Sequence, residues 1–381
     1  MLKILFLSVL FHNAVRTEKS EFWIGNAPVC EGAMYECSPL DMDLVKFDER
    51  GPPDSESCEE GYKALCRMPK PKAINQTQVD ATKLQLKILN YDMDLRNAGE
   101  PGTENKGENE RICFVGRALY ERFSDVDVVV MFGMRIRNCL RTKVTIYDYM
   151  TNYGWIHHVQ NGQTIIFSKY NIRLELALNY LSPATTSMIT RLKKEDHEFR
   201  IITHDLHDTT YGRNFTKILE RTEAFSRDLW KYLDSHITRG PAILVESTPF
   251  DSQVEAYRAG IINLYFDAQL LVPPIKPSVL KGSNEFADSY LAKWYKDETV
   301  VKNSSQENHF AIPDKGLKPS RSKLETVDDF QTDESSPILY CKFTVAFADQ
   351  WIFHITPECL NYKQTRQLSS HYPVLGTFTF S

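Results

Sequence analysis

The sequence predicts an α/β or α+β sandwich in which buried strands alternate with amphipathic helices. Several apolar runs, such as 127–131 and 242–246, do not alternate with polar residues, which is typical of strands covered on both faces. Stretches with apolar residues at helical spacing lie between these runs. Hydrophobic residues make up 42% and charged residues 25% of the 381 positions, which excludes a wholly disordered or fibrous chain. This length favours two domains, with three as the alternative.

The predicted strands are short apolar runs. Asp127–Met131 contains three valines, whose stiff side chains suit pleated sheet. Leu84–Asn90 alternates apolar and polar residues, which is the period of a half-buried strand. The full set is Leu84–Asn90, Asp127–Met131, Gln163–Ser168, Phe199–Thr203, Ala242–Glu246, Tyr340–Phe347, Trp351–Ile355 and Val374–Phe380.

Three stretches are predicted to be helices, namely Glu110–Phe123, Asn214–Leu233 and Asp251–Leu264. The segment 273–337 is polar and has few aliphatic residues. A segment of this length without a clear pattern is more often an insertion than part of a core. We therefore expect a polar surface insertion there, with a helix near Phe286–Lys296.

The first residues are typical of a secretory signal peptide. Lys3 is followed by a brief apolar stretch from Ile4 to Phe11 and then by polar residues. We expect a signal peptide over 1–18, with cleavage between Ala14 and Ser20; a buried N-terminal strand or helix is the alternative. The sequence has no apolar run of the ~20 residues that a transmembrane helix needs. The chain is therefore expected to be secreted and extracellular.

The eight cysteines fall into two sets, and in an oxidising compartment an even number indicates disulfide bonds. We expect the N-terminal four to pair among themselves, in one of three possible ways. A predicted hairpin brings Cys341 and Cys359 together, which leaves Cys113 with Cys139. A zinc site is not indicated, because no CxxC or HxxxH spacing occurs. The N-terminal set is Cys30, Cys37, Cys58 and Cys66.

These cysteines define a small module over 21–68, which is too short to bury much apolar surface without cross-links. A linker follows over 69–80, beginning with Pro69-Lys70-Pro71-Lys72, and the large domain spans 81–381. Asn75, Asn214 and Asn303 lie in sequons for N-glycosylation. The net charge of −5 and a pI of about 6.1 give no basic excess, so nucleic acid is not an expected partner.

Six strings in order resemble motifs of the endonuclease/exonuclease/phosphatase superfamily, and in particular its neutral sphingomyelinase branch. Residues 88–95 resemble the strand containing "SYNVW", 127–133 resemble "DVVVLQE", and 162–172 resemble "GLVIFSRYPI". Residues 202–204 match a Thr-His strand end, 241–249 stand where "VILAGDFN" is expected, and 369–380 resemble "LSDHYPVVATF". The resemblance implies an α+β fold, a four-layer α/β/β/α sandwich preceded by the disulfide-rich module.

The superfamily cleaves phosphodiesters with a divalent cation, usually magnesium, which neutralises charge on the phosphoryl oxygens. The resemblance implies that an Asn and a Glu hold the metal, that the Asp and Asn of "GDxN" orient the nucleophile and the phosphate, and that the His of "SDH" is the general base. At these positions this sequence keeps His204 and His371 and has Asp92 for the Asn. Asp92 is thus a candidate metal ligand, and the two histidines are candidate residual catalytic groups.

The sequence departs from the pattern at four further positions. Gly133 replaces the metal-binding Glu, Ser247 and Pro249 replace the Asp and Asn of "GDxN", and Ser370 replaces the Asp of "SDH". Catalytic groups that act as a unit lose activity non-additively, so these losses predict that ordinary catalysis is absent. No bound cofactor is therefore expected, with magnesium as the cofactor if the site does function.

The sequence thus predicts a secreted sphingomyelinase-like protein that is catalytically impaired and acts by binding. The expected partner is a phospholipid or another phosphodiester, or a secreted or cell-surface protein. The enzyme alternative is a metal-dependent sphingomyelin phosphodiesterase with a rearranged metal site, in which Glu246 supplies a carboxylate near Asp92. A third alternative is a structural protein without a cleft. The patch His204–Asp208 is a poor metal site, because positions 204 and 207 of a strand face opposite sides.

Overall fold

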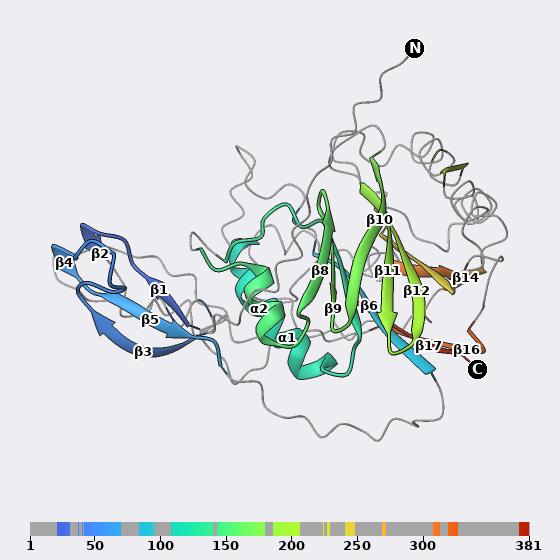
Figure 1. The fold of residues 1–381 in the computed structure, drawn as a ribbon, viewed down its shortest axis with the longest axis horizontal. Coiled ribbons are helices and arrows are strands. Elements are labelled where there is room, and N and C mark those ends of the chain that lie inside the picture. Colours follow the sequence, from blue (N-terminus) through green and yellow to red (C-terminus); the bar gives the residue numbers. More distant parts are fainter. Residues whose placement is uncertain are drawn as a thin grey trace, which may run out of the picture.

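Two six-stranded sheets packed face to face form the body of the protein in the computed structural model (Figure 1). A smaller three-stranded sheet lies at one end of the molecule, and two helices lie between it and the large sheets. The structure describes residues 21–30, 37, 40, 42–69, 84–93, 95, 108–139, 143–179, 186–205, 224, 227, 228, 241–247, 269–271, 308–312, 319–326 and 373–380.

The two large sheets are built from strands that are distant in the sequence. The first sheet has the order β16 (Arg321–Thr326), β17 (Val374–Phe380), β6 (Leu84–Asp92), β7 (Val128–Phe132), β9 (Thr164–Ser168) and β8 (His157–Asn161). The second has the order β10 (Asn171–Asn179), β11 (Thr186–Lys194), β12 (His197–Asp205), β13 (Ala242–Ser247), β15 (Asn308–Ile312) and β14 (Gln269–Leu271). Only β6–β7 and β12–β13 are parallel pairs within these sheets.

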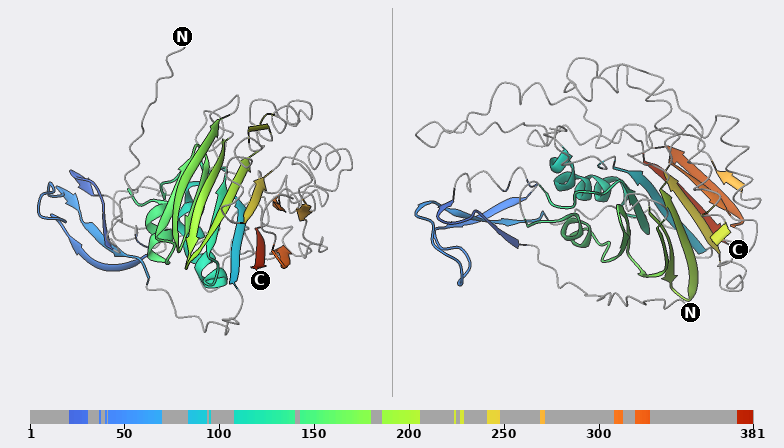
Figure 2. Two further views of the ribbon diagram at one scale, coloured as in Figure 1. Left: turned by 45° about the vertical axis from the view of Figure 1, so that its right-hand side comes forward. Right: turned by 90° about the horizontal axis from the view of Figure 1, so that it is seen from above.

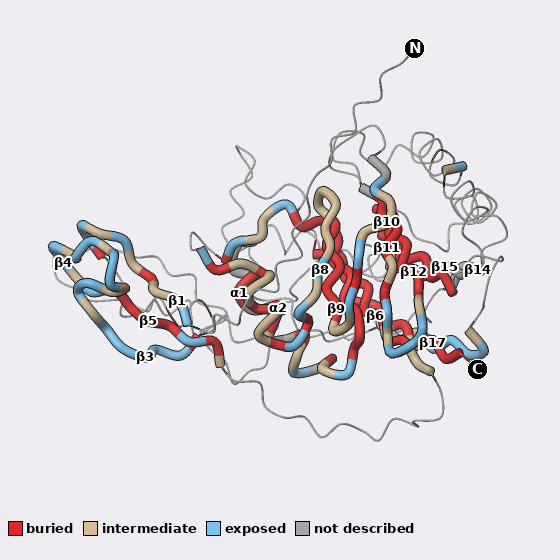
Figure 3. Tube along the Cα trace, in the orientation of Figure 1, coloured by how far each residue is buried: buried red, intermediate tan, exposed pale blue. Residues whose placement is uncertain are grey.

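Alternation along the strands builds a core on each face of the first sheet. On β6, Leu86 and Ile88 face the second sheet, whereas Leu89 and Tyr91 face the helices. Two helices cover that outer face, α1 (Glu108–Phe123) and α2 (Ile146–Asn152). Figure 3 shows the buried segments concentrated in the strands and in the inner parts of these helices. Among the described residues, no helix has the length and apolar character needed to cross a membrane.

The N-terminal module is a small sheet held by two disulfide bonds. Its strands have the order β1 (Glu21–Ile24), β5 (Lys63–Arg67) and β3 (Asp43–Asp48), and β2 (Val29–Cys30) pairs with β4 (Glu60–Gly61). The bonds Cys30–Cys58 and Cys37–Cys66 confirm that the module's cysteines pair among themselves. Cys113–Cys139 is also confirmed, and it joins α1 to the segment before α2. The expected pair Cys341–Cys359 lies outside the described residues.

The module shares its core with the helices of the large domain. Buried module residues, including Leu40, Met42 and Met68, belong to the same apolar cluster as α1 and α2. The Tyr149 hydroxyl on α2 donates a hydrogen bond to the Leu40 carbonyl at 2.6 Å. Figures 1 and 2 show the module beside these helices, on the side away from the second sheet. The module is therefore packed against the helices of the large domain through a shared apolar core.

The predicted elements that fall within the described residues are present. The strand Val374–Phe380 has the bounds that its pattern predicts, and the helix Glu110–Phe123 begins two residues earlier than expected. The expectation of a surface insertion over 273–337 was wrong in part, because β15 lies inside the second sheet and buries Phe310. Strand β15 has only five residues, and its three apolar residues, Phe310 to Ile312, are too short a run to have been predicted as a strand. Of the predicted helix Asn214–Leu233 only residues 224, 227 and 228 are described, and all three are helical. The helix Asp251–Leu264, the helix near Phe286–Lys296 and the strands Tyr340–Phe347 and Trp351–Ile355 lie outside the described residues.

Candidate functional site

Four strands end at one rim of the sandwich, and the candidate site lies there. β6 and β7 run parallel with Asp92 opposite Phe132 at their ends. β12 and β13 run parallel in the other sheet with Asp205 opposite Ser247. Since the carboxyl ends of parallel strands meet at one edge, each pair presents its last side chains together. The polar residues of this rim are completely or almost completely buried.

Two hydrogen bonds cross from one sheet to the other at the rim. The Ser247 hydroxyl on β13 donates to the Asp92 carboxylate on β6. The Asn90 side-chain amide on β6 donates to the Glu246 backbone carbonyl at 2.8 Å. Asn90 and Asp92 are two residues apart and continue the inward face of Leu86 and Ile88. The inter-sheet core therefore turns from apolar to polar as it reaches the rim.

A second polar pair lies on the opposite face of the same strands. His204 and Glu246 are register partners on β12 and β13, and His204 Nδ1 lies 3.1 Å from Glu246 Oε1. Successive residues of a strand face opposite sides, so Glu246 and Ser247 point away from each other. Ile243 and Val245 belong to the inter-sheet core, which places Ser247 inside and Glu246 outside.

The predicted site residues are therefore brought to one rim but not into one group. The Asp92 carboxylate faces Ser247 between the sheets, and the His204 ring pairs with Glu246 on the outer face. The rearranged metal site that Asp92 and Glu246 would form needs their carboxylates to converge, and this alternation of side chains keeps them apart. His371, Ser370 and Pro249 lie outside the described residues, as do Asn75, Asn214 and Asn303.

Gly133 follows β7 directly and has a backbone conformation that favours glycine. Its φ of 68° lies in the left-handed region, where a side chain is strained. Its carbonyl accepts the backbone N–H groups of Leu95 and Arg135 at 3.0 and 3.1 Å. The position at which the family pattern has a metal-binding Glu is thus shaped around a residue without a side chain.

The described residues do not fit the magnesium site that the family pattern implies. A hard cation needs several oxygen ligands held in place. Here one ligand position is Gly133, and the Asp92 carboxylate already accepts the Ser247 hydroxyl. Within the described part of the chain, no three His, Cys, Asp or Glu side chains form a group that could hold a metal ion.

Sequence reasoning gave no role in the site to three polar residues of the rim. Asn90 was treated only as part of a strand. It lies two residues before Asp92, so its side chain is on the same inward face of that strand. Asp205 is the register partner of Ser247 and so faces inward beside it. Thr203 is fully buried, and its hydroxyl has no hydrogen-bond partner among the described residues. The signal for all three was polarity at every second position of an otherwise apolar strand.

The other conspicuous histidines in the sequence are not part of this site. His157 and His158 lie on β8, at the far edge of the first sheet, and face opposite sides. The His158 ring lies 4.5 Å from the Tyr147 ring, and burial lowers the pKa of His157.

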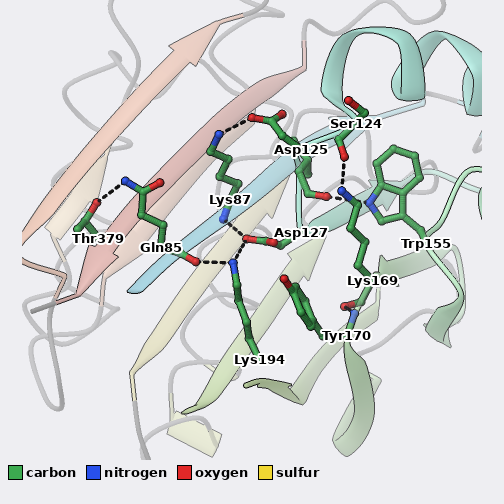
Figure 4. Close-up of polar contacts among 12 residues, drawn as sticks. Gln85, Lys87, Ser124, Asp125, Asp127, Trp155, Lys169, Tyr170, Lys194 and Thr379 are labelled. Atoms are coloured by element: carbon green, nitrogen blue, oxygen red, sulfur yellow. Dashed lines mark hydrogen bonds and ion pairs between the residues drawn. The ribbon is translucent and has the colours of Figure 1, made fainter. Parts of the chain in front are cut away.

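A second cluster of titratable residues lies near the other end of β6, about 20 Å along the strand from Asp92 (Figure 4). Asp127 accepts the Lys87 backbone N–H and the Lys194 ammonium, both at 2.8 Å. Lys194 ends β11 of the second sheet and Asp127 directly precedes β7 of the first, so this ion pair joins the sheets. Lys194 also donates to the Gln85 carbonyl at 2.6 Å.

Burial alters the pKa values of two residues in this cluster. Burial, reinforced by the negative charge of Asp127, raises the pKa of Tyr170 to about 12. Burial lowers the pKa of Lys169, against the opposing effect of Asp127 and Asp125. Figure 4 shows Lys169 beside Trp155, and its ammonium nitrogen lies 5.6 Å from the indole ring centroid. The cluster connects the two sheets at the end of the sandwich opposite the candidate site.

Solved structures share this fold, although no family model and no curated protein matches the chain. Sphingomyelinase C from Streptomyces griseocarneus aligns with a TM-score of 0.52 and 12% identity, over 77% of this chain and 99% of that one. Beta toxin from Staphylococcus aureus aligns with a TM-score of 0.50 and 12% identity, over 76% and 99%. The chain thus has the α/β/β/α sandwich fold of the endonuclease/exonuclease/phosphatase superfamily, preceded by a disulfide-rich module.

Proposed function

We propose that the chain is a secreted sphingomyelinase-like protein in which hydrolysis is impaired and binding is retained. Its expected ligand is a phospholipid or another phosphodiester. The Ser247–Asp92 hydrogen bond is the observation that carries the proposal. The family pattern has a metal-binding Asn where this chain has Asp92, and a carboxylate oxygen there could also hold a cation. Here the Asp92 carboxylate instead accepts a hydrogen bond from the neutral Ser247 hydroxyl.

The chemistry of the rim supports the loss of hydrolysis. Without a cation, charge that develops on the phosphoryl oxygens is not neutralised, and water near neutral pH is a poor nucleophile. Ser247 cannot supply the carboxylate that the family pattern uses to orient the nucleophile. His371 lacks an acidic neighbour at Ser370, so we expect it to be poorly oriented as a base.

The proposed compartment follows from the disulfide bonds and the first residues of the sequence. Three disulfide bonds are formed within the described residues, and such bonds persist in oxidising compartments. Together with the apolar stretch Ile4–Phe11 they favour a secreted, extracellular protein.

Vesicle sedimentation tests whether binding persists without hydrolysis. The purified chain is mixed with sphingomyelin vesicles in magnesium or in EDTA, and with vesicles of galactosylceramide, which has a similar lipid anchor but no phosphodiester. We expect the chain to sediment with sphingomyelin in both buffers and to release no phosphocholine. Binding that requires magnesium, or binding that does not discriminate the two lipids, would contradict the proposal.

The enzyme alternative makes a different prediction in the same experiment. A phosphodiesterase with a rearranged site would release phosphocholine in magnesium and none in EDTA. The opposite orientations of Glu246 and Ser247 argue against the rearrangement that pairs Glu246 with Asp92.

A further inference from the structure

The N-terminal module carries the excess negative charge of the chain. Residues 21–68 contain eleven acidic and four basic residues, a net charge of −7. The whole chain has a net charge of −5, so the rest of it has a net charge of +2. Such asymmetry creates a local negative potential that attracts cationic partners and repels anionic ones.

Strand β3 is an open edge of this module. In the described residues it has β5 on one side and no strand on the other. All of its residues before Asp48 are exposed, and Figure 3 shows the strand almost entirely in the exposed colour. An edge strand presents unpaired N–H and C=O groups, which form a template for another extended chain.

The apolar face of the module sheet continues to this open edge. Leu44 is 42% exposed and Phe47 is 38% exposed, although both lie in register with buried residues of β5. A strand added beside β3 would cover these two side chains. Two rows of paired residues cross the sheet from β1 through β5 to β3. One row is Ile24, Ala64 and Phe47, and the other is Phe22, Cys66 and Leu44.

Carboxylates flank the apolar pair on the same strand. Asp43 precedes Leu44, and Asp48 follows Phe47. Backbone N–H groups of Arg50 and Gly51 donate to Asp48 and lower the pKa of its carboxyl group, which keeps it charged. The strand's basic residue, Lys46, lies over the Trp23 ring with its nitrogen 5.2 Å from the ring centroid, and the same nitrogen lies 3.9 Å from the Asp48 carboxylate in an exposed ion pair. The edge therefore offers two apolar contacts with a carboxylate at each end, and only an exposed ion pair, which solvent weakens, compensates the charge of Asp48.

We propose that β3 is a docking edge for an extended, basic segment of a partner protein, which adds to the module sheet as a further strand. Main-chain hydrogen bonds to β3 supply affinity, and alternate side chains supply specificity. The apolar residues of the segment cover Leu44 and Phe47, and its lysine or arginine residues face Asp43 and Asp48.

The charge of the module selects this occupant over two others. A second copy of the chain would bring two modules of net charge −7 together, which repel each other. An anionic membrane surface would be repelled for the same reason. A basic polypeptide gains from the charge, and its extended backbone also satisfies the open edge.

The test uses the full chain and a short synthetic peptide of alternating lysine and valine residues. A matched peptide of alternating glutamate and valine is the control probe. Fluorescence anisotropy measures binding, and hydrogen–deuterium exchange measures protection of the amides of Asp43–Asp48. We expect the lysine peptide to bind and to protect these amides, and we expect its binding to weaken with added salt. The glutamate peptide should not bind.

Matched variants locate the binding site. The double variant Leu44→Ser with Phe47→Ser should weaken binding by about tenfold, since it removes two partly exposed apolar contacts. Val29→Ser is the control, because Val29 is 40% exposed on β2 and not on β3. Failure of the lysine peptide to bind, equal binding of both peptides, or binding without protection of the β3 amides would overturn the proposal. If the chain binds lipid vesicles and the double variant weakens that binding, the occupant of the β3 edge is a lipid and not a peptide.

Discussion

The hydroxyl group of Ser247 donates a hydrogen bond to the carboxylate of Asp92 and so joins the two sheets at the rim of the sandwich. Both side chains are fully buried. In the proposed function, this pair stands at two positions of the family pattern, the metal-binding Asn and the nucleophile-orienting Asp.

Ser247→Ala and Ser247→Asp should differ in their response to magnesium, because only the aspartate variant adds a carboxylate. The alanine variant leaves a buried carboxylate without this donor, which should lower the free energy of unfolding by about 2 kcal/mol. The aspartate variant places a second carboxylate beside Asp92, so its thermal midpoint should be low in EDTA and should rise in magnesium. Thermal unfolding in both buffers measures this difference.

Ser187→Asp is the control for this prediction. Ser187 is buried and is the register partner of His204, on the face opposite Ser247. Its aspartate variant should be destabilised without recovery in magnesium. Recovery of both aspartate variants to the same extent would contradict the orientation described for Ser247.

Gly133→Ala should destabilise the protein by about 1–2 kcal/mol, because alanine is strained at a φ of 68°. Gly133→Asn should be tolerated better, since asparagine visits the left-handed region more readily. For the same reason, Gly133→Glu alone should not create a cation site, and calorimetric titration with magnesium should give no binding. An alanine variant as stable as the original chain in urea would contradict the argument from backbone strain.

Lys194→Met should lower the free energy of unfolding by about 3 kcal/mol, because it removes the ammonium partner of the buried Asp127 carboxylate. Asp125→Ala breaks the neighbouring Lys87–Asp125 pair, in which the aspartate is 47% exposed, and should cost less than about 1 kcal/mol. Urea unfolding of the two variants under one condition makes the comparison. Equal losses would show that the inter-sheet ion pair has no special role.

Tyr170→Phe should reduce the sensitivity of the protein to alkali. The pKa of Tyr170 is raised to about 12 in the folded state from an ordinary value of 10.0. The unfolded chain therefore loses this proton first as the pH rises from about 10 to 12, and stability falls across that window. Lys169 has the opposite effect on the pH dependence of stability. Its folded-state pKa is lowered, so its contribution makes stability rise with pH below its ordinary value of 10.5.

Urea unfolding at several pH values between 9 and 12 measures this slope for the original chain and for Tyr170→Phe. The phenylalanine variant should show the shallower loss of stability above pH 10. Parallel slopes for the two proteins would show that ionisation of Tyr170 is not linked to folding.

The strands at the centre of the fold could be predicted because their burial leaves a local signal. Val128–Phe132 and Val374–Phe380 are apolar runs whose composition alone indicates sheet. Strand β15 could not be predicted in this way, because its apolar run is only three residues long, Phe310 to Ile312, and it acquires its conformation from pairing with β13 and β14. The positions of Asp92, Gly133, His204 and Ser247 at one rim followed from the order of the motifs.

The partners of these residues could not be predicted from the sequence. Which face of β13 each side chain takes depends on the register with β12, and this register separates Glu246 from Asp92. The left-handed backbone at Gly133 likewise has no local signal beyond the glycine itself. Packing of the module against α2 through Tyr149 and Leu40 depends on a contact between residues 109 positions apart.

Hydrolysis of sphingomyelin by the purified chain in magnesium tests the central claim most directly, with sphingomyelinase C as the positive control for the assay. We predict release of phosphocholine at the background rate, and the same rate for His204→Ala and His371→Ala. A robust rate in the original chain that His371→Ala abolishes would contradict the account.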